Sequence, residues 1–182
     1  MCFSTRSQDA TDDALAEALL DGSPDALGAL VCRYGARFYP LALRFAPDAA
    51  AARALVVAVF ETMMRELPLL GPQVAFIPWL WRLAADELLR SERAAPPVTT
   101  PFDRGLWSLE PRDRIALLLR EGGELERSAI AWILEEPVAA VAERLHRARL
   151  QLCPLVATLE APRLERLQPQ SSPEIPRSSH AP

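Results

Sequence analysis

Residues 125–152 constrain the fold more than any other stretch, because a proline there divides two helical patterns. In the first pattern Ile130, Ile133 and Leu134 recur at the spacing of one helix face. Pro137 cannot continue that helix, but its fixed φ suits the first residue of a new one. The second pattern is amphipathic, and its inward positions are Val138, Val141, Leu145, Ala148 and Leu152. Two helices joined by a tight turn are the layout of a helix-turn-helix.

The second of these helices carries the positive charges of the stretch. Its basic side chains lie off the inward stripe, at Arg144, His146, Arg147 and Arg149. A basic helix can enter the major groove of DNA and place guanidinium groups against phosphates and guanine edges. A plain helical hairpin with a solvated arginine face would have the same spacing, so the pattern alone leaves both interpretations open.

Two motifs in this region resemble a known family. The run over residues 130–149, which ends in RLHRAR, is similar to the promoter −35-binding domain of bacterial extracytoplasmic-function (ECF) sigma factors. The helix LEPRDRIALLLRE at residues 109–121 is similar to the preceding helix of that domain. The resemblance implies a set of DNA-binding residues, namely Arg127, Arg144, His146, Arg147 and Arg149.

The side of the second helix that faces DNA in the family departs from the family pattern at two positions. Ala142 and Glu143 stand where the family has a Lys-Ser pair, so one cation is lost and one anion is added. Phosphate affinity rises with the number of cations that a protein delivers. We therefore expect weaker DNA binding than in a typical member of the family.

Residues 52–68 and 76–86 are similar to the other domain of the family, which binds the clamp of RNA polymerase and opens the −10 element. For the polymerase contact, the resemblance implies Arg53, Leu55, Val56, Val59 and Phe60. For the −10 melting region, it implies Gln73, Trp81, Arg82 and Arg90.

The clamp-facing side departs further from the family pattern than the DNA-facing side does. Arg53-Ala54 and Val57-Ala58 replace acidic and amide side chains of the family, and the predicted helix is apolar nearly all round. Either the polymerase of this organism has a clamp surface that co-varied with this helix, or the chain uses the apolar patch to bind another protein. The sequence leaves both explanations open.

The patterns predict an all-α protein of two small helical domains, a sigma domain-two-like bundle followed by a helix-turn-helix domain-four-like bundle. The predicted divisions are a polar leader at 1–11, the first domain at 12–93, a Pro-rich linker at 94–101, the second domain at 102–160 and a disordered Pro/Ser-rich tail at 161–182. Within the first domain, Pro40 is expected to kink or break its helix, and Asp48 is expected to cap the next one.

Composition restricts the function classes. A net charge of −4 argues against a protein that coats nucleic acid generally, so any DNA contact must be local. Of the two histidines, His146 lies in the basic helix and His180 in the tail, so neither a Ser-His-Asp triad nor a zinc cluster is indicated, and no glycine-rich phosphate loop is present among 7 glycines. We therefore expect no enzyme, no cofactor and no metal.

The cysteine pattern and the length of the apolar runs indicate the cellular location. The 3 cysteines fall in no metal or disulfide pattern, and no apolar run has the length of a membrane span. Both features favour the cytoplasm and no membrane contact.

The sequence thus predicts an ECF-type RNA polymerase sigma factor that binds core RNA polymerase and promoter DNA and is a monomer when free. An anti-sigma factor is a further candidate partner. The alternative is a degenerate sigma-like regulatory protein that acts mainly through protein contacts, with weak or no promoter binding. A plain helix-turn-helix repressor would have to dimerise to read two half-sites.

Overall fold

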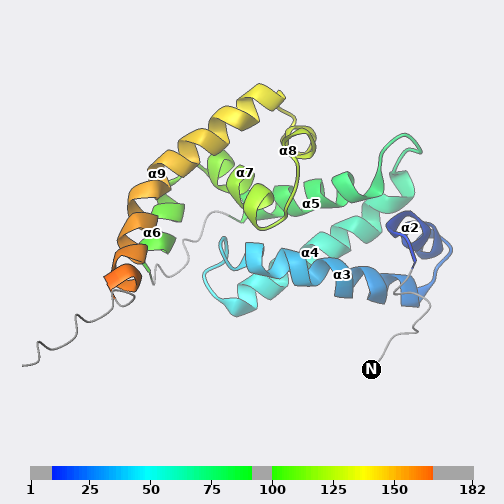
Figure 1. The fold of residues 1–182 in the computed structure, drawn as a ribbon. Coiled ribbons are helices and arrows are strands. Elements are labelled where there is room, and N and C mark those ends of the chain that lie inside the picture. The colour runs from blue at the N-terminus through cyan, green and yellow to red at the C-terminus, as the bar shows by residue number, and fades with distance from the viewer. Residues whose placement is uncertain (1–9, 92–99, 166–182) are drawn as a thin grey trace, which may run out of the picture.

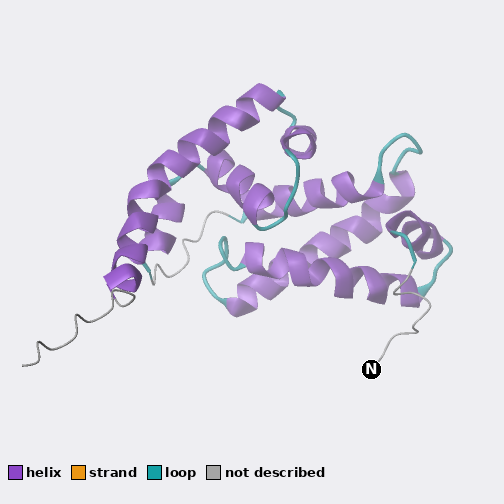
Figure 2. Cartoon of the chain, viewed as in Figure 1, coloured by secondary structure: helices purple, strands orange, loops and turns teal. Residues whose placement is uncertain are grey.

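The computed structural model describes residues 10–91 and 100–165, with side chains described as far as residue 154. Every regular element in these ranges is a helix, as the periodicity predicted (Figure 1, Figure 2). The N-terminal group consists of α2 (Asp12–Leu20), α3 (Pro24–Ala42), α4 (Ala49–Glu66), the 3-10 turn η1 (Leu67–Leu69) and α5 (Phe76–Arg90). The C-terminal group consists of α6 (Pro101–Ser108), α7 (Pro111–Glu121), α8 (Arg127–Leu134) and α9 (Val138–Glu165).

The predicted division of the chain falls partly outside the described residues. Most of the predicted leader, most of the predicted linker and residues 166–182 of the predicted tail lie there. At the other end of the tail, α9 continues to Glu165, so residues 161–165 are helical rather than part of a disordered segment.

Short polar side chains set where several helices begin. The Asp48 carboxylate accepts a hydrogen bond of 2.7 Å from the backbone N–H of Ala51, as the sequence predicted. Thr11 caps α2 in the same way at 3.3 Å. Thr100 and Asp103 form a reciprocal capping box at the start of α6. Such caps satisfy N–H groups that the first helical turn leaves without a partner, and each contributes about 1 kcal/mol.

Pro40 does not break its helix where we expected. α3 continues past it to Ala42 and ends at the cap residue Leu43. The proline ring removes one backbone hydrogen bond, but Leu41 and Ala42 are buried at 3% and 1% exposure. Packing of this last turn against the core therefore outweighs the lost bond, and the break comes two residues later.

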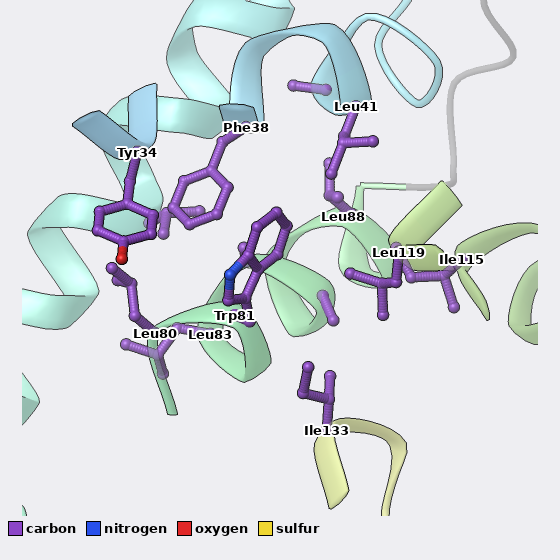
Figure 3. Close-up of a cluster of buried hydrophobic side chains, with 14 of the residues drawn as sticks. Tyr34, Phe38, Leu41, Leu80, Trp81, Leu83, Leu88, Ile115, Leu119 and Ile133 are labelled. Carbon is purple, nitrogen blue, oxygen red and sulfur yellow. The ribbon is translucent and has the colours of Figure 1, made fainter. Parts of the chain in front are cut away.

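One buried cluster runs through both helical groups (Figure 3). Trp81 on α5 is its centre, with 1% of its surface exposed and an edge-on contact of 4.9 Å between ring centroids to Phe38 on α3. From the C-terminal group, α7 adds Ile115 and Leu119, and α8 adds Ile133. α5 packs against α7 and α8 as well as against α4, so the two groups meet along this helix.

Two glycines at the end of α7 allow this close meeting. A Cβ on Gly122 would lie 2.8 Å from Cδ2 of Leu41, which belongs to α3. A Cβ on Gly123 would lie 3.1 Å from the ring of Trp81 and 2.7 Å from the backbone oxygen of Leu119. All three distances are shorter than an ordinary van der Waals contact, so the two groups approach closely at these glycines, and a side chain at either position would force neighbouring atoms to shift.

Candidate nucleic-acid interface

The turn between α8 and α9 has a defined backbone geometry. Glu135 adopts the left-handed conformation with φ of 55°, and its N–H bonds to the carbonyl of Trp132 at 3.3 Å. The N–H of Glu136 bonds to the carbonyl of Ala131 at 3.0 Å, which completes a Schellman ending. The carbonyl of Pro137 accepts the first hydrogen bond of α9, so the proline precedes the helix by one residue instead of opening it. The predicted helix-turn-helix is otherwise present.

The inward stripe of α9 holds this helix against the rest of its group. Four of its predicted positions are buried to 5% exposure or less, namely Val141, Leu145, Ala148 and Leu152. Val138 was also predicted to face inward, but it is 49% exposed. Helical side chains lean toward the N-terminus, so a residue in the first turn extends beyond the helices that cover the rest of the stripe.

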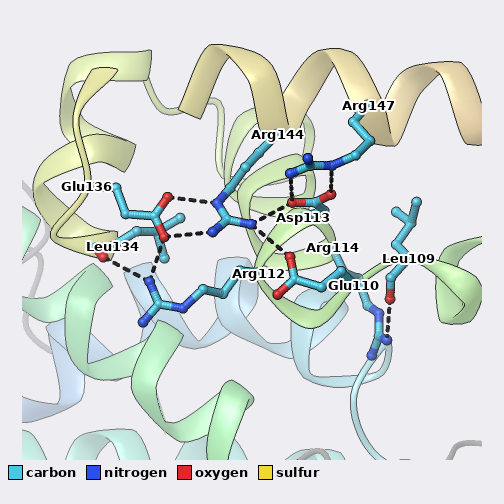
Figure 4. Close-up of polar contacts among 9 residues, drawn as sticks. All are labelled: Leu109, Glu110, Arg112, Asp113, Arg114, Leu134, Glu136, Arg144 and Arg147. Carbon is cyan, nitrogen blue, oxygen red and sulfur yellow. Dashed lines mark hydrogen bonds and ion pairs between the residues drawn. The ribbon is translucent and has the colours of Figure 1, made fainter. Parts of the chain in front are cut away.

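Arg144 lies in a cluster of acidic side chains that we call the carboxylate network (Figure 4). Its Nε donates to Glu136 at 2.7 Å, and its Nη1 lies 2.7 Å from both Asp113 and Glu110. Only 19% of the Arg144 side chain is exposed. The network as a whole comprises Glu110, Arg112, Asp113, Glu136, Arg144 and Arg147.

Arg147 meets the same network from the outer side. Its Nε and Nη2 donate to the two carboxylate oxygens of Asp113 at 2.6 and 3.0 Å. The Arg147 side chain is 54% exposed, whereas the Asp113 side chain is only 2% exposed. Arg147 thus extends toward solvent from a buried anchor, while Arg144 is enclosed.

The network determines the ionisation of its acids. Burial acts to raise the pKa of Asp113, but hydrogen bonds and charge from Arg147 and Arg144 outweigh it and hold that pKa below its usual range. The hydrogen bond from Arg144 likewise lowers the pKa of Glu136, helped by a 2.6 Å bond from Arg112. All three acids of the network are matched by its three arginines, so its formal charges cancel.

The remaining predicted DNA contacts lie on the surface. His146 is exposed on α9, and Arg127 is exposed at the first position of α8. Arg149 is half exposed and pairs with Glu121 of α7 at 2.7 Å. Glu143 is exposed on the same helix. The outer surface of the helix-turn-helix therefore presents separated cations, and Glu143 lies among those of α9.

The four residues predicted for the −10 region do not share one surface. Trp81 is 1% exposed where α5 meets the C-terminal group, so it cannot contact a DNA strand while the two groups are packed together. Arg82 pairs with Glu135 at 2.6 Å and lies 5.9 Å from the ring of Trp132. Gln73 is exposed in the loop before α5, and Arg90 is exposed at its end.

The predicted polymerase contact needs a correction at two positions. Val59 and Phe60 are buried at 2% and 7% exposure, and Phe60 packs 6.1 Å from Phe38 between ring centroids. They hold α4 in the core and cannot meet a partner. Leu55 and Val56 are partly buried, and the outer side of α4 is formed by Arg53, Val57 and Met64.

The spacing of buried residues along α4 indicates which side of this helix faces solvent. Ala52, Val59 and Met63 are buried at intervals of seven and four residues, which marks one face. Val57 then falls on the opposite face, where it is 54% exposed. Because α4 has apolar residues on every side, its hydrophobic pattern alone does not distinguish the buried face from the exposed one.

Other kinds of site are not evident in the part of the chain that the structure describes. No helix there is long and apolar enough to span a membrane. Nor do three or more metal-ligating side chains gather at any place in those residues.

Comparisons with known proteins agree with this geometry. The family model for sigma-70 region 4 matches residues 102–152, which contain the helix-turn-helix. No curated protein sequence matches the chain. Among solved structures, CnrH in complex with the cytosolic domain of CnrY has a TM-score of 0.70 and 25% identity, and the match covers 81% of this chain and 97% of that one.

A second solved structure has the same fold at lower identity. It is the sigma factor RpoE in complex with the anti-sigma factor NepR from Bartonella quintana, with a TM-score of 0.59 and 15% identity. The match covers 74% of this chain and 98% of that one, so the likeness extends over both helical groups. With a region 4 match in its C-terminal group and this fold throughout, the chain belongs to the ECF family of RNA polymerase sigma factors.

Proposed function

We propose that this sigma factor reads a promoter −35 element through the outer face of α9 and binds core RNA polymerase through its N-terminal group. The observation that carries the proposal is the placement of α9. Its inward stripe is buried, while His146 and Arg147 on its other side are exposed. A second helix held in this way can enter the major groove without any rearrangement of its own group.

The arginines of α9 have different roles in this proposal. Arg149 is half exposed and delivers charge to the DNA backbone, together with Arg127 at the start of α8. Arg147 is also half exposed, and it reaches base edges in the major groove. Arg144 is enclosed by carboxylates, and it braces α9 against α7 instead of meeting DNA. We expect the number of phosphate contacts to be small. The affinity for DNA should therefore fall with added salt, but with a shallow slope.

The two groups must separate for the chain to occupy a whole promoter. The −10 and −35 elements lie about 60 Å apart along the duplex, nearly two helical turns. In the arrangement described here α5 packs directly against α7 and α8. Binding to core polymerase would supply the free energy for separation, and the protein itself catalyses no covalent step.

A regulatory partner is a natural extension of this function. The two solved structures above hold their chains in complex with the cytosolic domain of CnrY and with the anti-sigma factor NepR. We propose that this chain is likewise regulated by an anti-sigma factor, in the cytoplasm where the polymerase acts.

Co-purification of the tagged full chain with core RNA polymerase from the same organism tests the proposal. The informative variant is Val57→Asp, which places a charge on the exposed side of α4 where Val57 is 54% exposed. Val31→Asp is the matched control, because Val31 is 39% exposed on α3. Phe60→Asp would be uninformative, since a charge at a buried position unfolds the bundle.

We expect the wild type and the Val31 variant to retain polymerase and the Val57 variant to lose it. Retention by all three would remove α4 from the polymerase contact. Failure of the wild type to retain polymerase would contradict the proposal, and it would favour the alternative of a sigma-like regulatory protein that acts through other protein contacts.

A further inference from the structure

We propose that Asp113 is a positioning residue for promoter recognition: its buried carboxylate orients the guanidinium of Arg147 toward DNA. The inference rests on the proposed reading of DNA by α9. Asp113 lies in the first turn of α7 with its side chain buried beneath Arg144 and Arg147, so it touches no DNA itself. Its effect on recognition passes through the side chain that it holds.

Asp113 is a rigid anchor. Its side chain is 2% exposed, and its backbone N–H bonds to the carbonyl of Glu110 at 2.9 Å within the first turn of α7. One carboxylate oxygen accepts from Arg144 Nη1 at 2.7 Å and from Arg147 Nη2 at 3.0 Å. The other accepts from Arg147 Nε at 2.6 Å. The carboxylate therefore cannot rotate without losing bonds to two arginines.

The anchor fixes one edge of Arg147 and leaves the other edge available. Nε and Nη2 face Asp113, whereas Nη1 has no hydrogen-bond partner among the described residues. A free arginine side chain loses about 2 kcal/mol of rotamer entropy when it is immobilised. Because Asp113 has already fixed this side chain in the free protein, less of that entropy is lost when Nη1 meets a base edge.

The same carboxylate has an opposing electrostatic effect. It cancels one positive charge on a surface that approaches an anionic duplex, which lowers affinity for any DNA sequence. Asp113 should therefore weaken non-specific binding while it improves the geometry of specific binding. Removing the charge should therefore strengthen non-specific binding and weaken specific binding. The ratio of the two affinities measures the role of Asp113.

The experiment uses the full chain and two duplexes of equal length. One duplex is selected by the wild-type protein from a pool with a randomised central segment, and the other has the selected sequence scrambled. Dissociation constants for both are measured by fluorescence anisotropy over a series of KCl concentrations. The specificity ratio is the scrambled constant divided by the selected one.

We expect Asp113→Asn to bind the scrambled duplex at least as tightly as the wild type, while its specificity ratio falls about tenfold. Glu110→Gln is the matched control. It removes the same charge and one hydrogen bond to Arg144, but it makes no bond to Arg147. Its affinities for the two duplexes should change together, so that its ratio stays at the wild-type value.

A double-mutant cycle tests whether Asp113 acts through Arg147. Arg147→Lys keeps the charge and loses the two-pronged geometry, so the ratio should fall while the salt dependence is kept. Adding Asp113→Asn to that variant should lower the ratio no further, since the interaction is already lost. If Asp113→Asn does not fold, Asp113→Glu replaces it, because this change keeps the charge and displaces the carboxylate by one methylene.

Three results would overturn the inference. One is an unchanged ratio in Asp113→Asn or its replacement, and another is additive losses in the double variant. If the wild type selects no sequence from the pool, both this inference and the proposed −35 recognition fail. A wild type that selects a sequence, with an Asp113 variant that retains the ratio, would remove only the positioning role.

Discussion

Arg82 on α5 and Glu135 in the turn of the helix-turn-helix form an ion pair of 2.6 Å that joins the two helical groups. The guanidinium of Arg82 also lies 5.9 Å from the centre of the Trp132 ring on α8. Glu135 reaches this position from a left-handed backbone conformation that ends α8. If Arg82 meets the −10 strand, as the family resemblance implies, it must first leave Glu135.

Glu135→Arg should shift the chain toward the separated arrangement. The pair is partly solvated, with 35% and 66% of the two side chains exposed, so its loss costs only about 0.2–1 kcal/mol. Repulsion between two arginines adds to this loss. Separation can be followed by distance measurements between spin labels on Cys32 and Cys153, which are both exposed and lie on α3 and α9.

In that measurement Cys2 is first replaced by serine, so that only two labels are present. Glu143→Arg is the control, because it introduces the same charge change on an exposed part of α9. We expect a longer or broader distance distribution for the Glu135 variant alone. Equal distributions for the wild type and the Glu135 variant would mean that the apolar contacts hold the groups together without this ion pair.

Gly123→Ala should destabilise the protein, because the added Cβ would crowd both the end of α7 and the ring of Trp81 on α5. The added Cβ would lie 2.7 Å from a backbone oxygen in α7, which cannot move aside without distorting the helix end. Overpacking of this kind costs about 1–3 kcal/mol. Chemical denaturation measures the loss, and Gly71→Ala is the control because no atom lies within 4 Å of its added Cβ. A Gly123 variant as stable as the control would show that the end of α7 relaxes freely.

Features that depend on neighbours in the sequence could be predicted well. Asp48 was identified as a cap because a cap bonds to an N–H three residues further along the chain. The inward stripe of α9 followed from its period, since Val141, Leu145 and Ala148 recur on one face of a helix. Both predictions use only local geometry, which the sequence determines directly.

Features that depend on distant partners could not be predicted. Arg144 resembles an exposed basic residue in the sequence, but its carboxylate partner Asp113 lies 31 positions earlier. Trp81 resembles a residue at the rim of a domain, and only the packing of α7 against α5 shows that it is buried. A helical period shows which side of a helix is apolar, but it does not show what covers that side.

Glu143→Arg should increase affinity for DNA. Glu143 is exposed on α9, and it stands in a segment where the family has a cation. The substitution removes one repulsive charge and adds one cation, so the plot of log affinity against log salt should steepen by about 0.9 for each added phosphate contact. Anisotropy titrations at several salt concentrations measure this slope. An unchanged slope would place position 143 away from the DNA backbone.

Acid should destabilise the C-terminal group through the carboxylate network. The pKa values of Asp113 and Glu136 lie below their ordinary values of 3.8 and 4.5, because arginines bond to both carboxylates. A lowered pKa in the folded state means that the unfolded chain takes up protons first. The stabilisation is therefore fully present above the ordinary pKa values, and it is lost as the pH falls from there through the lower values of the folded protein.

Thermal unfolding of the wild type and of Glu136→Gln from about pH 7 to about pH 3 measures this contribution. At neutral pH we expect the variant to be less stable by about 1.5–3 kcal/mol, the usual contribution of a hydrogen bond to a charged group. On acidification its stability should change less than that of the wild type, because one of the two titrating groups is gone. Asp86 opposes the trend, since burial raises its pKa and its protonation in acid favours folding. If the two proteins lost stability in parallel as the pH fell, the acid sensitivity would have to arise outside the network.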